Sequence, residues 1–156
     1  MISKTAKHAL AALTHLAELP DGQFAGAGDI AEEIDAPRNY LGKLLKTLAD
    51  QGVVESQKGK GGGFRLARDA ASITLIEAVE PIDHVSRWSE CFLGRGRCSE
   101  ESPCSVHDRW ARVRDAYLEF LQETSLAGLA ARTTMVMEEQ ARGDSDAATS
   151  RGSSCA

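Results

Sequence analysis

Residues 37–66 read PRNYLGKLLKTLADQGVVESQKGKGGGFRL and contain the pattern that decides the fold. Leucines at 41, 44, 45 and 48 recur at helical spacing, so this helix would have one apolar face and one polar face. Pro37 suits the first helical position, where its missing N–H costs nothing. Residues 53–57 have the alternating pattern of a β-strand. A lysine- and glycine-rich turn occupies 58–63, and residues 64–66 form the returning strand of a hairpin. The segment predicts a helix to about residue 50 and then a two-stranded hairpin.

Patterns upstream predict two further helices. A first apolar stripe at helical spacing comprises Ile2, Ala6, Leu10, Leu13 and Ala17. A Pro-Asp-Gly turn at 20–22 ends this helix, a short helix over 27–34 follows, and a tight turn at 35–36 precedes the third helix. Helix, helix, turn, helix and hairpin is the order of a winged helix-turn-helix. The predicted fold class is therefore mainly α, with a two-stranded β wing.

The second half of the chain predicts a long helix. Thr74 and Glu77 have capping-box spacing and start a short helix that Pro81 is expected to stop. Apolar residues later repeat at steps of four and three, namely Val106, Trp110, Val113, Tyr117 and Phe120. This spacing matches a coiled-coil seam and predicts a C-terminal dimerisation helix. One more helical stretch is expected at 125–131.

These elements predict four segments. A winged helix-turn-helix domain covers residues 1–80, a cysteine-rich loop 81–105, a dimerisation helix region 106–132, and a disordered tail 133–156. The 156 residues contain no apolar run of about 18 residues and no secretory pattern at the N-terminus, so a cytoplasmic protein is expected. The sequence also lacks a glycine-rich nucleophile turn or a phosphate-binding loop, which argues against an enzyme.

Local charge indicates DNA binding although the net charge is −5. Between residues 37 and 68, seven lysines and arginines face only two acidic side chains. Local rather than net charge decides contact with phosphates, and a recognition helix presents its polar face to base edges. The candidate DNA-binding residues are Arg38, Asn39, Tyr40, Lys43 and Lys46 on the helix, and Lys58, Lys60 and Arg65 in the hairpin.

A second candidate site has the pattern Cys91-x6-Cys98-x5-Cys104-x2-His107. Thiols stay reduced in the cytosol, so this cluster indicates metal ligands rather than disulfides. Zinc sites favour closer cysteine pairs, so the spacing favours an iron–sulfur cluster. Three cysteines with His107 suffice for a 2Fe–2S cluster, and three with an outside ligand for a 4Fe–4S cluster. A zinc site and a metal-free thiol switch remain alternatives. Cys155 is expected to be a free thiol.

Five motifs together resemble the Rrf-two-type family of bacterial regulators over residues 1–132. They are the Asn-Tyr-Leu that opens the third helix at 39–41, GKGGGF at 59–64, ITLIEAV at 73–79, the cysteine triad, and TSLAGL at 124–129. The resemblance implies a homodimeric winged-helix transcription factor that binds a pseudo-palindromic operator in double-stranded DNA.

The resemblance also implies a ligand set. Cys91, Cys98 and Cys104 match the family's cluster cysteines, and His107 matches the fourth ligand of the IscR-like branch, which holds a 2Fe–2S cluster. The alternative NsrR-like branch comprises nitric-oxide-sensing repressors with a 4Fe–4S cluster. Some of its members take a carboxylate from the first helix of the partner subunit. Lys7 stands at that position here, and the adjacent histidine, as His8 of the partner subunit, is an alternative ligand.

Two departures from the IscR pattern accompany this match. The first cysteine gap is six residues instead of the usual five, and Gly42 stands where that branch carries a base-reading glutamate. A different operator sequence is therefore expected.

Overall fold

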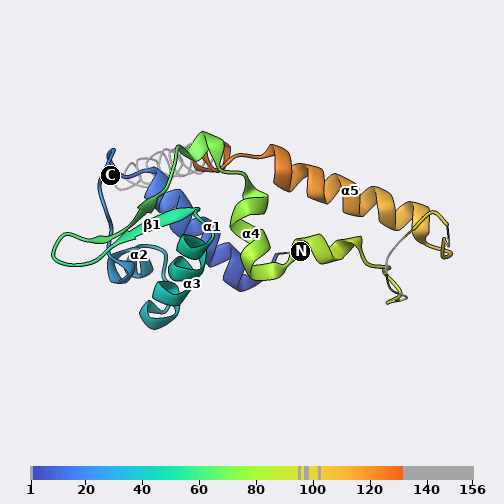
Figure 1. Ribbon diagram of the computed structural model, residues 1–156, viewed down its shortest axis with the longest axis horizontal. Coiled ribbons are helices and arrows are strands. Elements are labelled where there is room, and N and C mark those ends of the chain that lie inside the picture. Colours follow the sequence, from blue (N-terminus) through green and yellow to red (C-terminus); the bar gives the residue numbers. More distant parts are fainter. Residues whose placement is uncertain (1, 95, 97–98, 102, 132–156) are drawn as a thin grey trace, which may run out of the picture.

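The structure is a computed structural model that describes residues 2–94, 96, 99–101 and 103–131. Its elements are α1 (Lys4–Ala17), α2 (Ala27–Glu33), α3 (Arg38–Asp50), β1 (Val54–Gln57), β2 (Gly63–Leu66), the 3-10 helix η1 (Ala70–Ser72), α4 (Leu75–Asp83), the 3-10 helix η2 (Val85–Ser89) and α5 (His107–Glu123). Residues 126–131 are also helical. The mainly α winged-helix fold class is confirmed (Figure 1). The predicted tail and Cys155 lie outside the described residues.

The recognition helix α3 forms where its leucine pattern places it. All four leucines are buried, with Leu41, Leu45 and Leu48 at 0% exposure. Pro37 is the N-cap residue rather than the first helical residue, and it is in the extended conformation. The prediction for Pro37 was therefore wrong by one position. In both positions the absent N–H removes no helical hydrogen bond.

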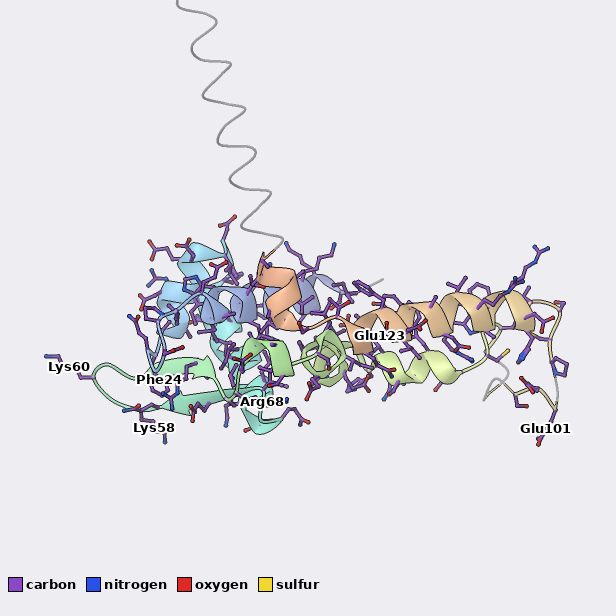
Figure 2. All side chains as sticks on the ribbon, turned by 90° about the horizontal axis from the view of Figure 1, so that it is seen from above. Phe24, Lys58, Lys60, Arg68, Glu101 and Glu123 are labelled. Carbon is purple, nitrogen blue, oxygen red and sulfur yellow. The ribbon has the colours of Figure 1, made fainter. Side chains whose placement is uncertain are left out.

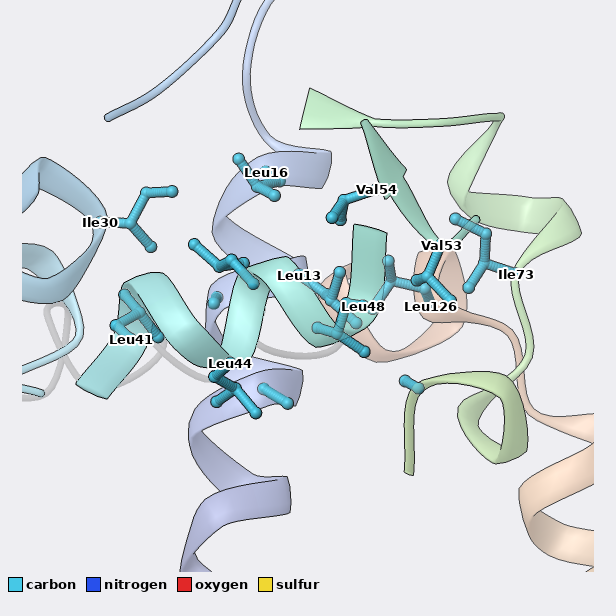
Figure 3. Packing of buried hydrophobic residues seen from close by; sticks show 14 of the residues in the cluster. Leu13, Leu16, Ile30, Leu41, Leu44, Leu48, Val53, Val54, Ile73 and Leu126 are labelled. Atoms are coloured by element: carbon cyan, nitrogen blue, oxygen red, sulfur yellow. The ribbon is translucent and has the colours of Figure 1, made fainter. Parts of the chain in front are cut away.

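The main core joins α1, α2, α3 and β1, and it includes residues from much later in the chain (Figure 3). Leu126, in the helical stretch after α5, is completely buried beside Ile73 and Val53. The N–H of Leu126 donates to the carbonyl of Ile73 at 2.8 Å, and the N–H of Leu75 donates to that of Thr124 at 2.9 Å. Part of the predicted dimerisation region thus completes the core of the winged-helix half.

Helix α4 continues through Pro81 to Asp83, so the predicted stop at this proline is wrong. A proline removes only the one bond to the carbonyl four residues earlier, here that of Glu77, and just two helical residues follow it. The helix ends at His84, which has a φ of 49°, and its N–H donates to the carbonyl of Glu80 at 3.0 Å. The carboxylate of Glu80 in turn accepts from the N–H and hydroxyl of Ser86.

The predicted capping box at the start of α4 is confirmed. The carboxylate of Glu77 accepts from the N–H of Thr74 at 2.9 Å, and the hydroxyl of Thr74 accepts from the N–H of Glu77. Arg68 donates to the same carboxylate at 2.5 Å. Burial acts to raise the pKa of Glu77, but the hydrogen bonds from Arg68 and Thr74 outweigh it and hold that pKa below its ordinary value.

We expect Glu77→Gln to lower the free energy of unfolding by about 1 kcal/mol at neutral pH, because it weakens a cap and a half-exposed ion pair. A carboxylate whose pKa is lowered by folding contributes stability above its unfolded pKa and loses it as the pH falls through the folded pKa. Urea unfolding of both proteins at pH 7 and about pH 3 measures this difference. A cost that is the same at both pH values would contradict the prediction.

Helix α5 projects away from the winged domain, so the wing and the cysteine-bearing loop lie at opposite ends of the elongated molecule (Figures 1 and 2). In Figure 2, Lys60 marks the tip of the wing and Glu101 marks the far end of the loop. No described helix is long and apolar enough to cross a membrane.

Candidate nucleic-acid interface and cysteine loop

The polar face of α3 is exposed opposite its buried leucines. It carries Arg38, Asn39, Lys43 and Lys46, all exposed. The guanidinium of Arg38 pairs with Glu32 at 2.6 Å, and Lys46 lies 3.7 Å from Asp50. Both pairs are highly exposed and would be weak in water. Lys43 makes no ion pair with any described residue, so its ammonium group is available to an incoming phosphate or base.

Tyr40 differs from the other candidates on α3 because it is partly buried against the main core. Its ring meets the ring of His8 edge-on, with centroids 5.8 Å apart. The Nδ1 atom of His8 is buried and has no hydrogen-bond partner within the part of the chain that the structure describes. His8, the alternative cluster ligand, thus packs beside the start of the recognition helix of its own subunit.

The wing presents its two lysines at the hairpin turn. Lys58 and Lys60 are exposed, and Figure 2 shows them at the end of the molecule that carries the wing. Gly59 and Gly61 in this turn have φ values of 99° and 78°, a region that residues with a Cβ rarely enter. The turn therefore extends both lysines into solvent without making an ion pair to a described residue.

Arg65 occupies a different environment from the lysines. Its side chain forms an ion pair with Glu55 on the neighbouring strand. It also donates to the carbonyl of Gly22 at 3.3 Å and lies 4.6 Å above the ring of Phe24. The sequence pattern grouped Arg65 with the DNA-binding lysines, and it offered no signal that the loop before α2 would reach this strand.

At the opposite end, the structure brings part of the predicted ligand set to the start of α5. His107 is its first residue, and the N–H of His107 donates to the carbonyl of Cys104 at 3.0 Å. The indole N–H of Trp110 donates to the carbonyl of Glu90 at 3.3 Å, which places Cys91 near the first turns of the same helix. Cys91 and Cys104 are partly buried, whereas Cys98 lies outside the described residues.

The described residues contain no converged group of three histidine, cysteine or acidic side chains. The donor types nevertheless fit an iron–sulfur cluster, since thiolates with a histidine are its usual protein ligands. Cys104 and His107 lie within one turn of each other, and Cys91 is held beside the same helix end. These three residues, with Cys98, remain the predicted ligand set.

Aromatic packing holds the chain that leads into the cysteine loop. Trp88 of η2 stacks on Tyr117 with ring centroids 4.6 Å apart, and its centroid lies 5.8 Å from that of Trp110. Phe92 extends this packing, 5.2 Å from Trp110. Burial of large rings is a major stabilising contribution, so these contacts hold η2 against α5.

The predicted coiled-coil seam of α5 is divided between two faces. Trp110 and Tyr117 pack against η2 of the same chain, whereas Val113 and Phe120 are 60% and 54% exposed. Beside Val113 lies a shallow depression of about 210 Å³, lined by Phe92, Val106, Arg109, Trp110 and Val113. Only half of the seam therefore remains free to meet another molecule.

A polar junction lies where the start of α1, the end of α4 and the middle of α5 meet. The N–H and hydroxyl of Ser3, the N-cap of α1, donate to the carboxylate of Asp83 at 2.7 and 2.5 Å. The hydroxyl of Tyr117 is buried without a hydrogen-bond partner among the described residues. Burial and the negative charge of Asp83 raise the pKa of Tyr117 above its ordinary value. The end of α4, the start of α1 and the middle of α5 thus meet at one point.

Comparison with known proteins gives consistent matches. The model of a protein family, Rrf2, described as an iron-dependent transcriptional regulator, matches residues 2–132. A protein of Aquifex aeolicus strain VF5, assigned as a helix-turn-helix-type transcriptional regulator, is 33% identical over 131 residues, which cover 83% of this chain and 90% of that protein. The helix-turn-helix-type transcriptional regulator IscR of Escherichia coli K12 is 28% identical over 128 residues, covering 82% of this chain and 78% of IscR.

Solved structures show the same architecture. CymR (YrzC), the global cysteine regulator of B. subtilis, superimposes with a TM-score of 0.72 at 25% identity, covering 85% of this chain and 97% of CymR. IscR of T. potens gives a TM-score of 0.68 at 22% identity, covering 85% of this chain and 88% of that one. At this lower identity the likeness to T. potens IscR shows the fold alone.

Proposed function

Because the chain belongs to the Rrf2 family of transcriptional regulators, we propose that it is a homodimeric, iron–sulfur-dependent regulator that binds a pseudo-palindromic DNA operator. One observation carries the proposal. A basic recognition helix and wing occupy one end of the molecule, and the loop that contains Cys91 and Cys104 lies with the start of α5, His107, at the other end. DNA binding and sensing thus have separate sites joined by α5 and η2.

The exposed face of α3 would read the operator. Asn39 can pair with adenine, and Lys43 with guanine or phosphate. Arg38 and Lys46 would exchange their weak acidic partners for DNA, since exposed ion pairs contribute little. Tyr40 would support the start of the helix from its partly buried position. Two exposed lysines on the wing, Lys58 and Lys60, would contact the phosphate backbone.

The exposed half of the α5 seam would meet a second copy of the chain. Val113 and Phe120 are large apolar side chains with more than half of their surface in solvent, which is typical of a contact surface. A two-fold dimer places its recognition helices on half-sites about 34 Å apart or a multiple of this distance. Small changes in how η2 packs on α5 would alter that spacing, and allosteric coupling of this kind is typically about 1–3 kcal/mol.

Cys91, Cys98, Cys104 and His107 would hold the cluster, with a 2Fe–2S centre favoured. When bound, such a cluster supplies a centre through which the protein would sense cluster status, redox state or nitric oxide. His8 of the partner subunit and a 4Fe–4S cluster are the ligand and cofactor of the NsrR-like alternative. The likeness to CymR, named a global cysteine regulator, supports a second candidate: a thiol- or zinc-based regulator of the same fold.

Purification without oxygen, followed by visible spectroscopy and iron and sulfide determination, tests the cofactor. Structured visible absorption with about two irons per chain would support the 2Fe–2S centre, and about four irons the 4Fe–4S alternative. A colourless protein without iron after cluster reconstitution would exclude the iron–sulfur proposal and favour zinc or a thiol switch.

Lys43→Ala is expected to weaken operator binding by about 1–3 kcal/mol if the lysine contacts a base. If the lysine binds a phosphate instead, the slope of log K against log [salt] should fall by about one. Fluorescence anisotropy on an operator duplex at several salt concentrations measures both effects. Arg87→Ala is the matched control, because it removes an equal charge from an exposed residue of η2, which packs mainly on α4 and α5 rather than on α3 or the wing. Unchanged affinity in Lys43→Ala would remove this residue from the recognition surface.

A further inference from the structure

The loop that joins α1 to α2 pairs with the wing like a short third strand. Ala25 and Phe64 exchange two main-chain hydrogen bonds, of 2.9 and 2.8 Å. Gly63 precedes this pair with a φ of 147°, and a Cβ atom there would lie 2.2 Å from the carbonyl oxygen of Ala25. The approach is too close for any other residue. The main chain of the wing is therefore joined directly to the segment that enters the helix-turn-helix.

Arg65 reinforces this connection from the neighbouring position on β2. Its register partner on β1 is Glu55, and the two side chains form an ion pair. The same guanidinium reaches the carbonyl of Gly22 and covers the ring of Phe24, both in the α1–α2 loop. A planar guanidinium can combine directional hydrogen bonds with stacking on an aromatic face, which a lysine ammonium cannot do.

The engagement of Arg65 contrasts with that of the other basic residues of the wing. The Arg65 side chain is 36% exposed, and it bonds through Nε and one terminal nitrogen within the protein. Lys58 and Lys60 are exposed and make no ion pair with the residues that the structure describes. Among these basic residues of the hairpin, Arg65 is therefore engaged within the protein, and the two lysines are available to bind a phosphate.

We propose that Arg65 is a positioning residue that fixes the angle between wing and recognition helix, and that it does not contact DNA. The inference rests on DNA binding by this winged helix, and it replaces the DNA contact expected for Arg65 from the sequence. Mechanically, Arg65 holds the loop that leads into α2, and α2 packs against α3. In the bound complex the lysines of the wing and the face of α3 engage one duplex at this spacing. A wing without the Arg65 contacts has to be ordered on binding, which costs affinity without removing a phosphate contact.

The dependence of operator affinity on salt separates a positioning role from a phosphate contact. The slope of log K against log [salt] reports the number of phosphates that the protein neutralises. We expect Arg65→Lys and Arg65→Gln each to weaken binding by about five- to tenfold, because the stacking and fork-shaped bonds are lost. Their slopes should equal that of the wild type, whereas Lys58→Ala and Lys60→Ala should each lower the slope by about one.

Phe24→Leu provides an independent test, because it removes the aromatic face under Arg65 and leaves every charge in place. It should weaken operator binding in the same direction, again with an unchanged slope. Circular dichroism and thermal unfolding of each variant establish that a folded protein is being measured. A folded Arg65→Lys that binds like the wild type, or an Arg65→Gln whose slope falls by about one, would overturn the positioning role. Wild-type protein without salt-dependent duplex binding would instead contradict the proposed function.

Discussion

Alanine in place of Cys98 is expected to abolish both the visible absorption and the iron of protein purified without oxygen. Iron–sulfur clusters are held by thiolates, and the sequence around the described donors offers no other thiol within this loop to replace Cys98. Cys91 and Cys104, together with His107, would remain near the start of α5, but three donors do not complete the four-ligand set. The expected change is therefore complete loss rather than a shifted spectrum.

The fold itself should survive this substitution. The main core is built from α1, α2, α3 and β1 with Ile73, Ala78 and Leu126, and none of the described residues from 91 to 105 belongs to it. Cys155→Ala is the matched control, since it removes a thiol from the C-terminal segment and should leave colour and iron content unchanged. A Cys98→Ala protein that is still coloured, with an unaltered spectrum, would show that Cys98 is not a ligand.

Glutamate in place of Val113 is expected to convert the proposed dimer into a monomer and to reduce operator affinity by roughly 10²- to 10⁴-fold. Val113 is 60% exposed on α5, so the folded monomer tolerates a charged side chain at this position. In a dimer the same carboxylate would be buried against a second apolar seam, where an unpaired charge is strongly unfavourable. A monomer would contact only one half-site, so it would lose the increase in affinity that comes from linking two recognition helices.

Sedimentation velocity and operator titration of the same samples measure the two effects together. Gln122→Glu is the matched control, because it adds the same charge to an exposed position two residues after Phe120, away from the seam. It should remain dimeric and bind the operator normally. A dimeric Val113→Glu with full affinity would place the subunit contact elsewhere on the molecule.

The sequence predicted the winged helix because its signals are local. The leucines of α3 and the glycine-rich turn specify their elements through neighbours three or four residues away or directly across a hairpin. The stop at Pro81 was mispredicted for the same reason. A local rule cannot weigh the missing hydrogen bond against the packing of α4, where Leu75 and Val79 are buried in a second apolar cluster with Ala6 and Leu121.

The sequence predicted which residues could belong to the candidate sites better than it predicted what each residue does there. Lys43, Lys58 and Lys60 are exposed as their pattern indicated, and their contact with DNA stays a prediction. Arg65 looked the same in the sequence, but its partners Gly22 and Phe24 come from a loop about forty residues earlier. Likewise, the heptad spacing of α5 could not show that Trp110 and Tyr117 would be covered by Trp88.

By itself, the sequence determined the winged-helix fold and the polar face of α3, since these depend on residue type and short-range spacing; the donor set of the cysteine loop stays a prediction. Only the tertiary structure decided that Arg65 contacts Gly22 and Phe24, that Trp110 and Tyr117 of the α5 seam are covered by Trp88, and that Leu126 returns to the N-terminal core. The physical reason is that a side chain bonds to whatever the fold brings within a few ångströms, and those partners lie far away along the chain.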